Sequence, residues 1–170
     1  MIIFITGGIK SGKSRRALDI VKNEWAFPVS FIATAEALDE EMRRRIEKHR
    51  KERLEMAPDA AAGFITIEEP LEVDRAIASA GRRALVDCIP MWVNNLMYYK
   101  RENDFERILE SFIQGMKDCI VVSNETGMGN VPFDEKTRRY NLLLAGANRR
   151  IAAAAARVEL MVSGIPVRIK

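Results

Sequence analysis

Residues 1–25, MIIFITGGIKSGKSRRALDIVKNEW, decide the fold of this chain. Residues 7–14 form a complete G-x-x-x-x-G-K-[ST] motif, preceded by the apolar run 2–5 and followed by apolar residues at helical spacing. A strand, a glycine-rich loop and a helix N-terminus in this order surround a phosphate with backbone N–H groups and a partial positive charge. The residues predicted to do so are Gly7, Gly8, Ile9, Lys10, Ser11, Gly12, Lys13 and Ser14.

Three side chains extend this phosphate site. Lys13 is expected to reach the β- and γ-phosphates of a nucleoside triphosphate, and the Ser14 hydroxyl can ligate Mg²⁺. Asp87 ends the apolar run 84–86, and a carboxylate at the tip of such a strand holds Mg²⁺ or its water shell opposite the loop. The alternative for Asp87 is an acid that favours the N-terminus of the next helix.

Length and composition predict one nucleotide-binding domain over residues 1–170. A chain of 170 residues with 48% hydrophobic residues can bury a sizeable core. No run is long enough to span a membrane and no secretory signal is visible, so we expect a cytoplasmic protein. Cys88 and Cys119 lie in apolar runs without a C-x-x-C motif, which indicates buried small hydrophobes. The net charge of +3 does not separate a small anionic ligand from nucleic acid.

Strand and helix patterns alternate along the chain. Strands are predicted at 2–6, 29–33, 65–68, 84–88, 119–123 and 158–163, with a terminal hairpin to 166–169 across Gly164-Ile165. Helices are predicted at 13–24, 36–54, 70–80, 91–100, 104–117 and 134–157, and residues 55–63 read as a loop. Together with the phosphate loop, this order predicts an α/β, P-loop NTPase-like domain in three layers around a mostly parallel sheet.

The only histidine, His49, lies in a basic segment at 43–53. On a helix it shares a face with Arg45 and Arg53. Histidine is an accepted covalent nucleophile, and the cations around it suit a triphosphate. A solvated basic helix with an incidental histidine is the stronger interpretation from composition alone. Nucleic-acid binding is not expected, because no aromatic residue interleaves the basic run and Glu47 and Glu52 interrupt it.

A polar, glycine-bearing loop at 123–132, SNETGMGNVP, follows the strand predicted at 119–123. In open α/β sheets the carboxyl ends of the strands form the ligand edge. The loop is therefore expected beside the ligand, although two glycines also suit a plain turn.

These segments together resemble a known family over essentially the whole chain. The matching pieces are Thr6-Gly7-Gly8 through Lys13-Ser14-Arg15, Ile32-Ala33-Thr34-Ala35, Asp39-Glu40-Glu41-Met42 with Arg45-Ile46 and His49, Glu68-Glu69-Pro70, Val86-Asp87-Cys88 with Trp92 and Asn95-Leu96, Asn124-Glu125 with Gly127 and Gly129, Val131-Pro132, and Gly164-Ile165-Pro166. The chain is similar to the bifunctional adenosylcobinamide kinase/adenosylcobinamide-phosphate guanylyltransferases of cobalamin biosynthesis.

The resemblance implies two reactions. ATP or GTP phosphorylates the terminal hydroxyl of the aminopropanol arm of adenosylcobinamide. A histidine then attacks GTP at the α-phosphorus, pyrophosphate leaves, and GMP passes from the histidine to adenosylcobinamide phosphate, which gives adenosyl-GDP-cobinamide. The guanylylated histidine falls on His49, so the resemblance reverses the interpretation from composition.

The resemblance also implies further site residues. Those lining the nucleotide site are Ala33, Thr34, Ala35, Arg50, Lys51, Glu52, Arg53, Glu68 and Asp87. Mg²⁺ is the implied cofactor, with Ser14 and Asp87 as its ligands, and ATP and GTP are substrates. A homo-oligomer, and specifically a trimer, is implied as well.

The chain departs from the family pattern at a few positions. Phe64 stands where a tryptophan is usual, and the stretch 54–63 lacks the expected glycine-arginine-proline pattern. After Pro132, Asn141 and Leu142 replace a charged pair, and Arg149 replaces a glutamine. A guanylyltransferase alone, a generic P-loop small-molecule kinase, and a nucleotide-gated regulatory ATPase remain as alternatives.

Overall fold

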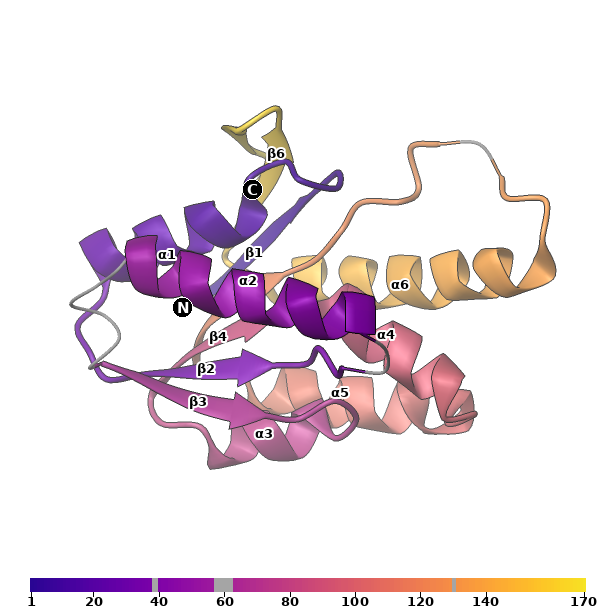
Figure 1. The fold of residues 1–170 in the computed structure, drawn as a ribbon, viewed down its shortest axis with the longest axis horizontal. Coiled ribbons are helices and arrows are strands. Elements are labelled where there is room, and N and C mark those ends of the chain that lie inside the picture. Colours follow the sequence, from indigo (N-terminus) through magenta and orange to yellow (C-terminus); the bar gives the residue numbers. More distant parts are fainter. Residues whose placement is uncertain (38–39, 57–62, 130) are drawn as a thin grey trace.

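The computed structural model describes residues 1–37, 40–56, 63–129 and 131–170. Its seven strands form one sheet in the order β3-β2-β4-β5-β1-β6-β7 (Figure 1). The strands are β1 (Ile2–Gly7), β2 (Val29–Ala33), β3 (Phe64–Glu68), β4 (Arg83–Asp87), β5 (Asp118–Val122), β6 (Arg157–Val162) and β7 (Ile165–Arg168). Every neighbouring pair is parallel except β6 and β7. The predicted α/β fold with a mostly parallel sheet is confirmed.

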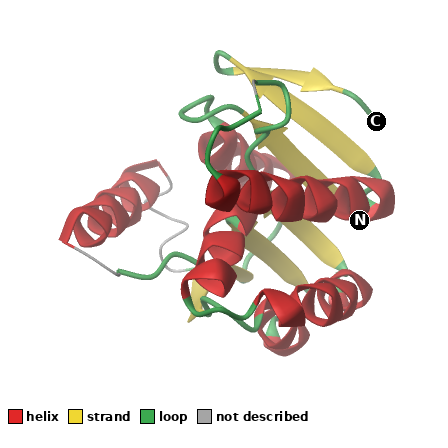
Figure 2. Ribbon diagram, turned by 90° about the vertical axis from the view of Figure 1, so that its right-hand side faces the viewer, coloured by secondary structure: helices red, strands yellow, loops and turns green. Residues whose placement is uncertain are grey.

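Helices cover both faces of the sheet (Figure 2). They are α1 (Lys13–Glu24), α2 (Glu40–Met56), α3 (Val73–Ser79), α4 (Ile89–Tyr98), the short 3-10 helix η2 (Glu102–Asp104), α5 (Phe105–Gly115) and α6 (Glu135–Ala154). Alternate residues of a strand point to opposite faces. Phe4 of β1 therefore packs with α3, α4, α5 and α6, whereas Ile3 and Ile5 pack with α1 on the other face. None of the helices in the described ranges is long and apolar enough to cross a bilayer.

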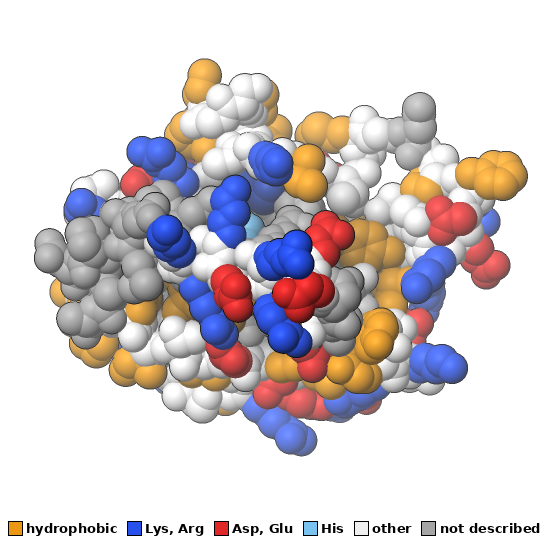
Figure 3. Space-filling model, viewed as in Figure 1, with side chains coloured by type: hydrophobic (Ala, Val, Ile, Leu, Met, Phe, Trp, Pro, Cys, Tyr) orange, Lys and Arg blue, Asp and Glu red, His pale blue; other side chains and the backbone are white. Residues whose placement is uncertain are grey.

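Helix α2 differs from the other long helices in that none of its described side chains is buried. Figure 2 shows it as an outlying helix, and Figure 3 shows that lysine, arginine and acidic side chains mix on the face it presents. The prediction of a helix over 36–54 is wrong at both ends. Residues 36–37 are not helical, and residues 55–56 belong to α2 rather than to the predicted loop. The rest of that loop, apart from Gly63, lies outside the described residues.

Two helices begin away from their predicted positions for local reasons. Helix α3 begins at Val73 rather than at residue 70, because the Glu69 carboxylate accepts the N–H groups of Leu71 and Glu72, both at 2.9 Å, and shapes a turn first. Helix α4 begins two residues earlier than predicted, with Pro90 in its first turn, where a backbone N–H is not needed.

Helix α6 ends at Ala154 instead of residue 157. The alanine run 152–156, which the prediction placed wholly in the helix, is therefore helical only as far as residue 154. Ala155 is extended, and the Ala156 N–H donates to the carbonyl of Ile2 at 2.9 Å. The chain thus joins β1 as it enters β6. Strands β3, β4, β5, β6 and β7 likewise begin one residue earlier than predicted, while β2 keeps its predicted bounds.

The predicted terminal hairpin is present, with its turn one residue earlier, at Ser163 and Gly164. Both residues have left-handed φ values, 50° and 87°, the pattern of the tight turns that suit twisted hairpins. The Gly164 N–H donates to the Ser11 carbonyl at 3.1 Å. The hairpin therefore supports the phosphate loop from its outer side.

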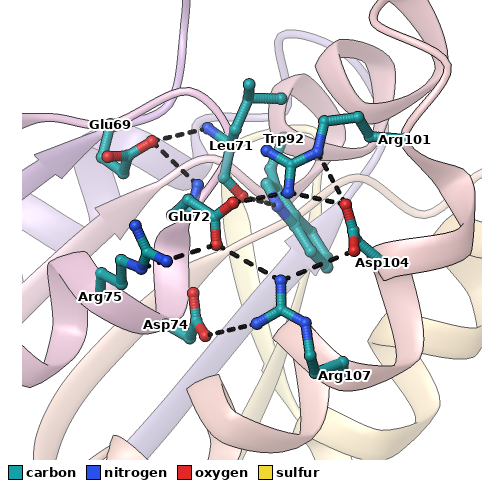
Figure 4. Close-up of polar contacts among 9 residues, drawn as sticks. All are labelled: Glu69, Leu71, Glu72, Asp74, Arg75, Trp92, Arg101, Asp104 and Arg107. Carbon is teal, nitrogen blue, oxygen red and sulfur yellow. Dashed lines mark hydrogen bonds and ion pairs between the residues drawn. The ribbon is translucent and has the colours of Figure 1, made fainter.

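A network of acids and arginines fixes the segment that follows β3 (Figure 4). Arg101 binds Glu72 at 2.6 Å, and Arg107 bridges Glu72 and Asp74, both at 3.5 Å. Burial alone would raise the pKa of Glu72, but the hydrogen bond and charge of Arg101 outweigh it and hold that pKa below its usual value. Because the network is anchored on α5, it holds the connection from β3 to α3 against the body of the fold.

Candidate active site

The phosphate loop has a backbone that only glycine accommodates at two points. Gly7, where β1 ends, has φ 150°, and a Cβ there would lie 2.5 Å from the Met161 carbonyl oxygen of β6. Gly12 caps α1 in the left-handed region, with φ 93°. The Arg16 N–H donates to the Gly12 carbonyl at 2.9 Å, so the helix starts directly at the loop and directs its N-terminal N–H groups toward it.

Lys13 is the buried cation of this loop, with 8% of its surface exposed. Its Nζ donates to the Gly8 carbonyl at 2.5 Å and lies 3.5 Å from the Ser11 hydroxyl, so the side chain curls over the loop. Burial lowers the pKa of Lys13, and the nearby Cys88 and Asp87 partly offset that shift. A desolvated ammonium group in this position interacts strongly with a phosphate.

Asp87, at the end of β4, is held by the segment that follows β2. Thr34 is fully buried, and its hydroxyl donates to the Cys88 carbonyl at 2.6 Å and accepts the Cys88 N–H at 2.9 Å. The Asn95 amide of α4 in turn donates to the Thr34 carbonyl at 2.7 Å. Thr34 therefore contributes to the site by bracing the backbone beside Asp87, because its hydroxyl is already engaged.

Ser14 and Asp87 offer oxygen ligands suited to Mg²⁺, and both side chains are half-buried. Within the described ranges no cluster of three or more histidine, cysteine, aspartate or glutamate side chains could hold a metal by itself. A hydroxyl and one carboxylate, completed by phosphate oxygens and water, is the usual Mg²⁺ environment in nucleotide sites. The residues fit that ion in the presence of a nucleotide.

The predicted residues on α2 lie at the periphery of the fold. His49 and Lys51 are exposed, and Arg50 forms an ion pair with Glu68 at the end of β3. Glu68 is in register with Ala33 at the end of β2, and Ala35 follows in the same loop. Arg50, Glu68 and Ala33 therefore lie at the carboxyl edge of the sheet. Glu52 and Arg53 are in α2, but their side chains, like that of Arg45, lie outside the described part of the chain.

A second ion-pair group, which sequence reasoning missed, lies beneath α1. Glu159 of β6 is only 3% exposed and accepts two hydrogen bonds from Arg16, at 2.8 and 3.0 Å, and further ones from Arg157. The hydrogen bond from Arg16 is the main cause that lowers the pKa of Glu159. An acid inside the apolar run 158–162 was the available sequence signal. This pairing anchors the first turn of α1, and so Lys13 and Ser14, to the sheet.

The fold and the site define a P-loop nucleotide-binding enzyme, and comparison with known proteins identifies its family. The family model described as "Cobinamide kinase / cobinamide phosphate guanyltransferase" matches residues 3–169, and the chain belongs to this family. The resemblance stated from the sequence is thereby confirmed.

Sequence relatives support this family assignment. The bifunctional adenosylcobalamin biosynthesis protein CobP of Pseudomonas aeruginosa is 40% identical, over 98% of this chain and 95% of that protein. The CobU proteins of Escherichia coli and Salmonella typhimurium are 33% and 35% identical over the full length of both chains. Among solved structures, a KaiC-like protein from Pyrococcus horikoshii is similar, with a TM-score of 0.49 and 18% identity over 94% of this chain and 69% of that one.

Proposed function

We propose that this chain, as one nucleotide-binding domain, carries out both reactions named for its family. It phosphorylates adenosylcobinamide from ATP or GTP, and it transfers GMP from GTP to the phosphorylated product through His49. The observation that carries the proposal is the complete phosphate loop with its buried Lys13, in a chain that belongs to this family. The loop follows β1 and Asp87 ends β4, so the two lie on either side of β5.

The phosphate loop supports the first reaction. Backbone N–H groups of the loop and of the first turn of α1 would bind the phosphates, and Lys13 would neutralise the charge that develops on them. Mg²⁺, held by Ser14 and Asp87 together with the nucleotide, would supply further charge neutralisation. Ala33, Thr34 and Ala35 would border the nucleotide, because Ala33 ends β2 in register with Asp87 and the other two residues follow it at the same edge of the sheet.

His49 supports the second reaction. Its imidazole is exposed on α2, and a nucleophile must reach the α-phosphorus of GTP directly. Arg50, Lys51 and Arg53 follow it along the helix, and guanidinium groups stabilise charge on a transferring phosphoryl group. The ion pair between Arg50 and Glu68, which ends β3, supports a position of this basic segment close to the carboxyl edge of the sheet.

One experiment separates the proposal from its alternatives. The protein is incubated with Mg²⁺ and α-labelled GTP without a corrinoid, denatured, and examined for retained label. We expect label that is acid-labile and base-stable, as in a phosphoramidate, and that is lost in His49→Ala. γ-Labelled GTP under the same conditions is the control and should leave no label.

The result assigns the chemistry. A GTP-binding protein that stays unlabelled but phosphorylates cobinamide would be a kinase alone. A labelled protein without phosphorylation of cobinamide would be a guanylyltransferase alone. A protein with neither reaction, and with salt-sensitive binding of an acidic partner, would instead be a regulatory ATPase.

We also propose that the chain acts as a homo-oligomer, and specifically a trimer, in which the outlying α2 offers His49 to a neighbouring subunit. Every described side chain of α2 is half-buried or exposed, which supports this arrangement. Light scattering at micromolar concentration is expected to give the mass of a trimer, and a monomer would contradict it.

A further inference from the structure

The loop after β5 occupies a position that the proposed roles leave unexplained. Strand β5 lies between β4 and β1, and Val122 is in register with Asp87 on one side and Ile5 on the other. The residues that follow Val122 therefore leave the sheet between the carboxylate of the metal site and the phosphate loop. A transferred phosphoryl group must lie in the same interval.

Backbone hydrogen bonds fix this loop against the phosphate loop. The Ser123 N–H donates to the Ile5 carbonyl at 2.9 Å, and the Glu125 N–H donates to the Gly7 carbonyl at 3.0 Å. Gly7 is the first residue of the phosphate motif. The main chain of Glu125 consequently lies in direct contact with the start of the phosphate loop.

A buried amide of α6 holds the same loop from behind. The Ser123 hydroxyl donates to Asn148 Oδ1 at 2.6 Å, and Asn148 Nδ2 donates to the Asn124 carbonyl at 2.8 Å. Ser123 is fully buried and Asn148 is 8% exposed. Because both ends of the Asn148 amide are engaged, the residue sets the path of the chain just before Glu125 without being available to a ligand itself.

The Glu125 carboxylate is oriented by a backbone N–H group and has no cationic partner among the described side chains. It is half-buried, and Oε1 accepts the Gly127 N–H at 2.7 Å. Elsewhere in the fold, Glu68, Glu72 and Glu159 are each paired with an arginine. Within the described ranges no lysine or arginine forms an ion pair with Glu125, so no cation of this part of the chain competes with a substrate for the carboxylate.

We propose that Glu125 is a catalytic residue of the phosphorylation step and accepts the proton of the acceptor hydroxyl. This inference rests on the proposed kinase function. As the hydroxyl oxygen bonds to the terminal phosphorus, the bond from that phosphorus to its bridging oxygen breaks and the nucleoside diphosphate leaves. The hydroxyl proton passes to the Glu125 carboxylate, which later releases it to water. The role is confined to phosphorylation, because attack by the His49 imidazole on GTP requires no hydroxyl to be deprotonated.

The test compares Glu125→Gln with the wild-type protein in two reactions. Glutamine keeps the oxygen that accepts the Gly127 N–H but cannot take a proton. We expect kcat for phosphorylation of cobinamide by γ-labelled ATP to fall about 10²- to 10⁴-fold, with KM for ATP changed less than about threefold. The acid limb of the kcat profile should disappear, and labelling of His49 by α-labelled GTP should be unchanged. Glu125→Asp should recover part of the lost rate.

Glu135→Gln, an exposed acid in the first turn of α6, is the matched control and should leave both reactions intact. Wild-type kcat in Glu125→Gln would overturn the inference and leave the proposed function standing. Equal loss of phosphorylation and labelling would overturn it too, since that pattern means a structural role. A wild-type protein that labels His49 but never phosphorylates cobinamide would overturn both the kinase proposal and this inference.

Discussion

The phosphate loop and helix α2 carry the two predicted reactive groups in opposite environments. Lys13 is buried and hydrogen-bonded to its own loop, which the terminal hairpin holds through Gly164, and Glu159 of β6 binds Arg16 of the helix that follows. His49 lies on a helix with no buried described side chain, and an exposed ion pair, Arg50 with Glu68, links that helix to the sheet. A rigid site suits charge stabilisation, which depends on preorganised dipoles. A peripheral helix suits a nucleophile that must carry a nucleotidyl group from one substrate to another.

The comparison predicts that removing Lys13 affects more chemistry than removing His49. In Lys13→Ala the shared phosphate site loses its buried ammonium, so phosphorylation and His49 labelling should both fall, by about 10³-fold. Initial rates of both reactions at saturating nucleotide measure this. Lys22→Ala, in the last turn of α1, is the control and should leave both rates unchanged. Undiminished GTP turnover in Lys13→Ala would contradict the site assignment.

The same contrast explains what the sequence could and could not predict. Helix α1 was predicted to the residue, because a local motif fixes where the helix starts, whereas β1 runs one residue further than predicted, to Gly7. Helix α2 was misplaced at both ends, because none of its described side chains is buried and they form no apolar stripe whose limits would mark the helix. The family resemblance, rather than any pattern in the residues, singled out His49.

Hydrogen bonds between residues far apart in the sequence could not be predicted either. Thr34 with Cys88, Ser123 with Asn148, and Arg16 with Glu159 join residues 54, 25 and 143 positions apart. The Thr34 hydroxyl bonds the backbone of Cys88, and the other two contacts join polar side chains. All these residue types are ordinary in their own segments, and the contacts depend on the strand order. A single sequence does not specify that order, although it predicts that Asp87 and the start of the loop after residue 122 lie at the carboxyl ends of parallel strands, as the structure shows.

The buried support of the phosphate loop should also control stability. Glu159→Gln removes the charge that Arg16 and Arg157 bind, and it should lower the free energy of unfolding at pH 7 by about 2 kcal/mol. Chemical denaturation measures this. Glu106→Gln, which removes an exposed partner of Arg150, is the control and should change stability by less than about 0.5 kcal/mol.

The pH dependence gives a second readout of Glu159. Because its pKa is lower in the folded protein than in the unfolded chain, its stabilising contribution is complete above the usual glutamate pKa of about 4.3. It is lost as the pH falls from there through the lower, folded value. The variant should therefore lose less stability than the wild type between about pH 5 and pH 2. Parallel curves for the two proteins would show that Glu159 is not anchored as described.

The ion pair between Arg50 of α2 and Glu68 of β3 should contribute little to stability. Arg50 and Glu68 have 51% and 60% of their side chains exposed, and pairs of that kind contribute less than about 1 kcal/mol because water and salt screen them. A double-mutant cycle with Arg50→Ala and Glu68→Ala should give a coupling of about 0.5 kcal/mol in the free energy of unfolding. That coupling should vanish at high salt. A coupling above about 2 kcal/mol would mean that α2 is fixed as firmly as the phosphate loop, and the contrast between a rigid phosphate site and a peripheral nucleophile would no longer hold.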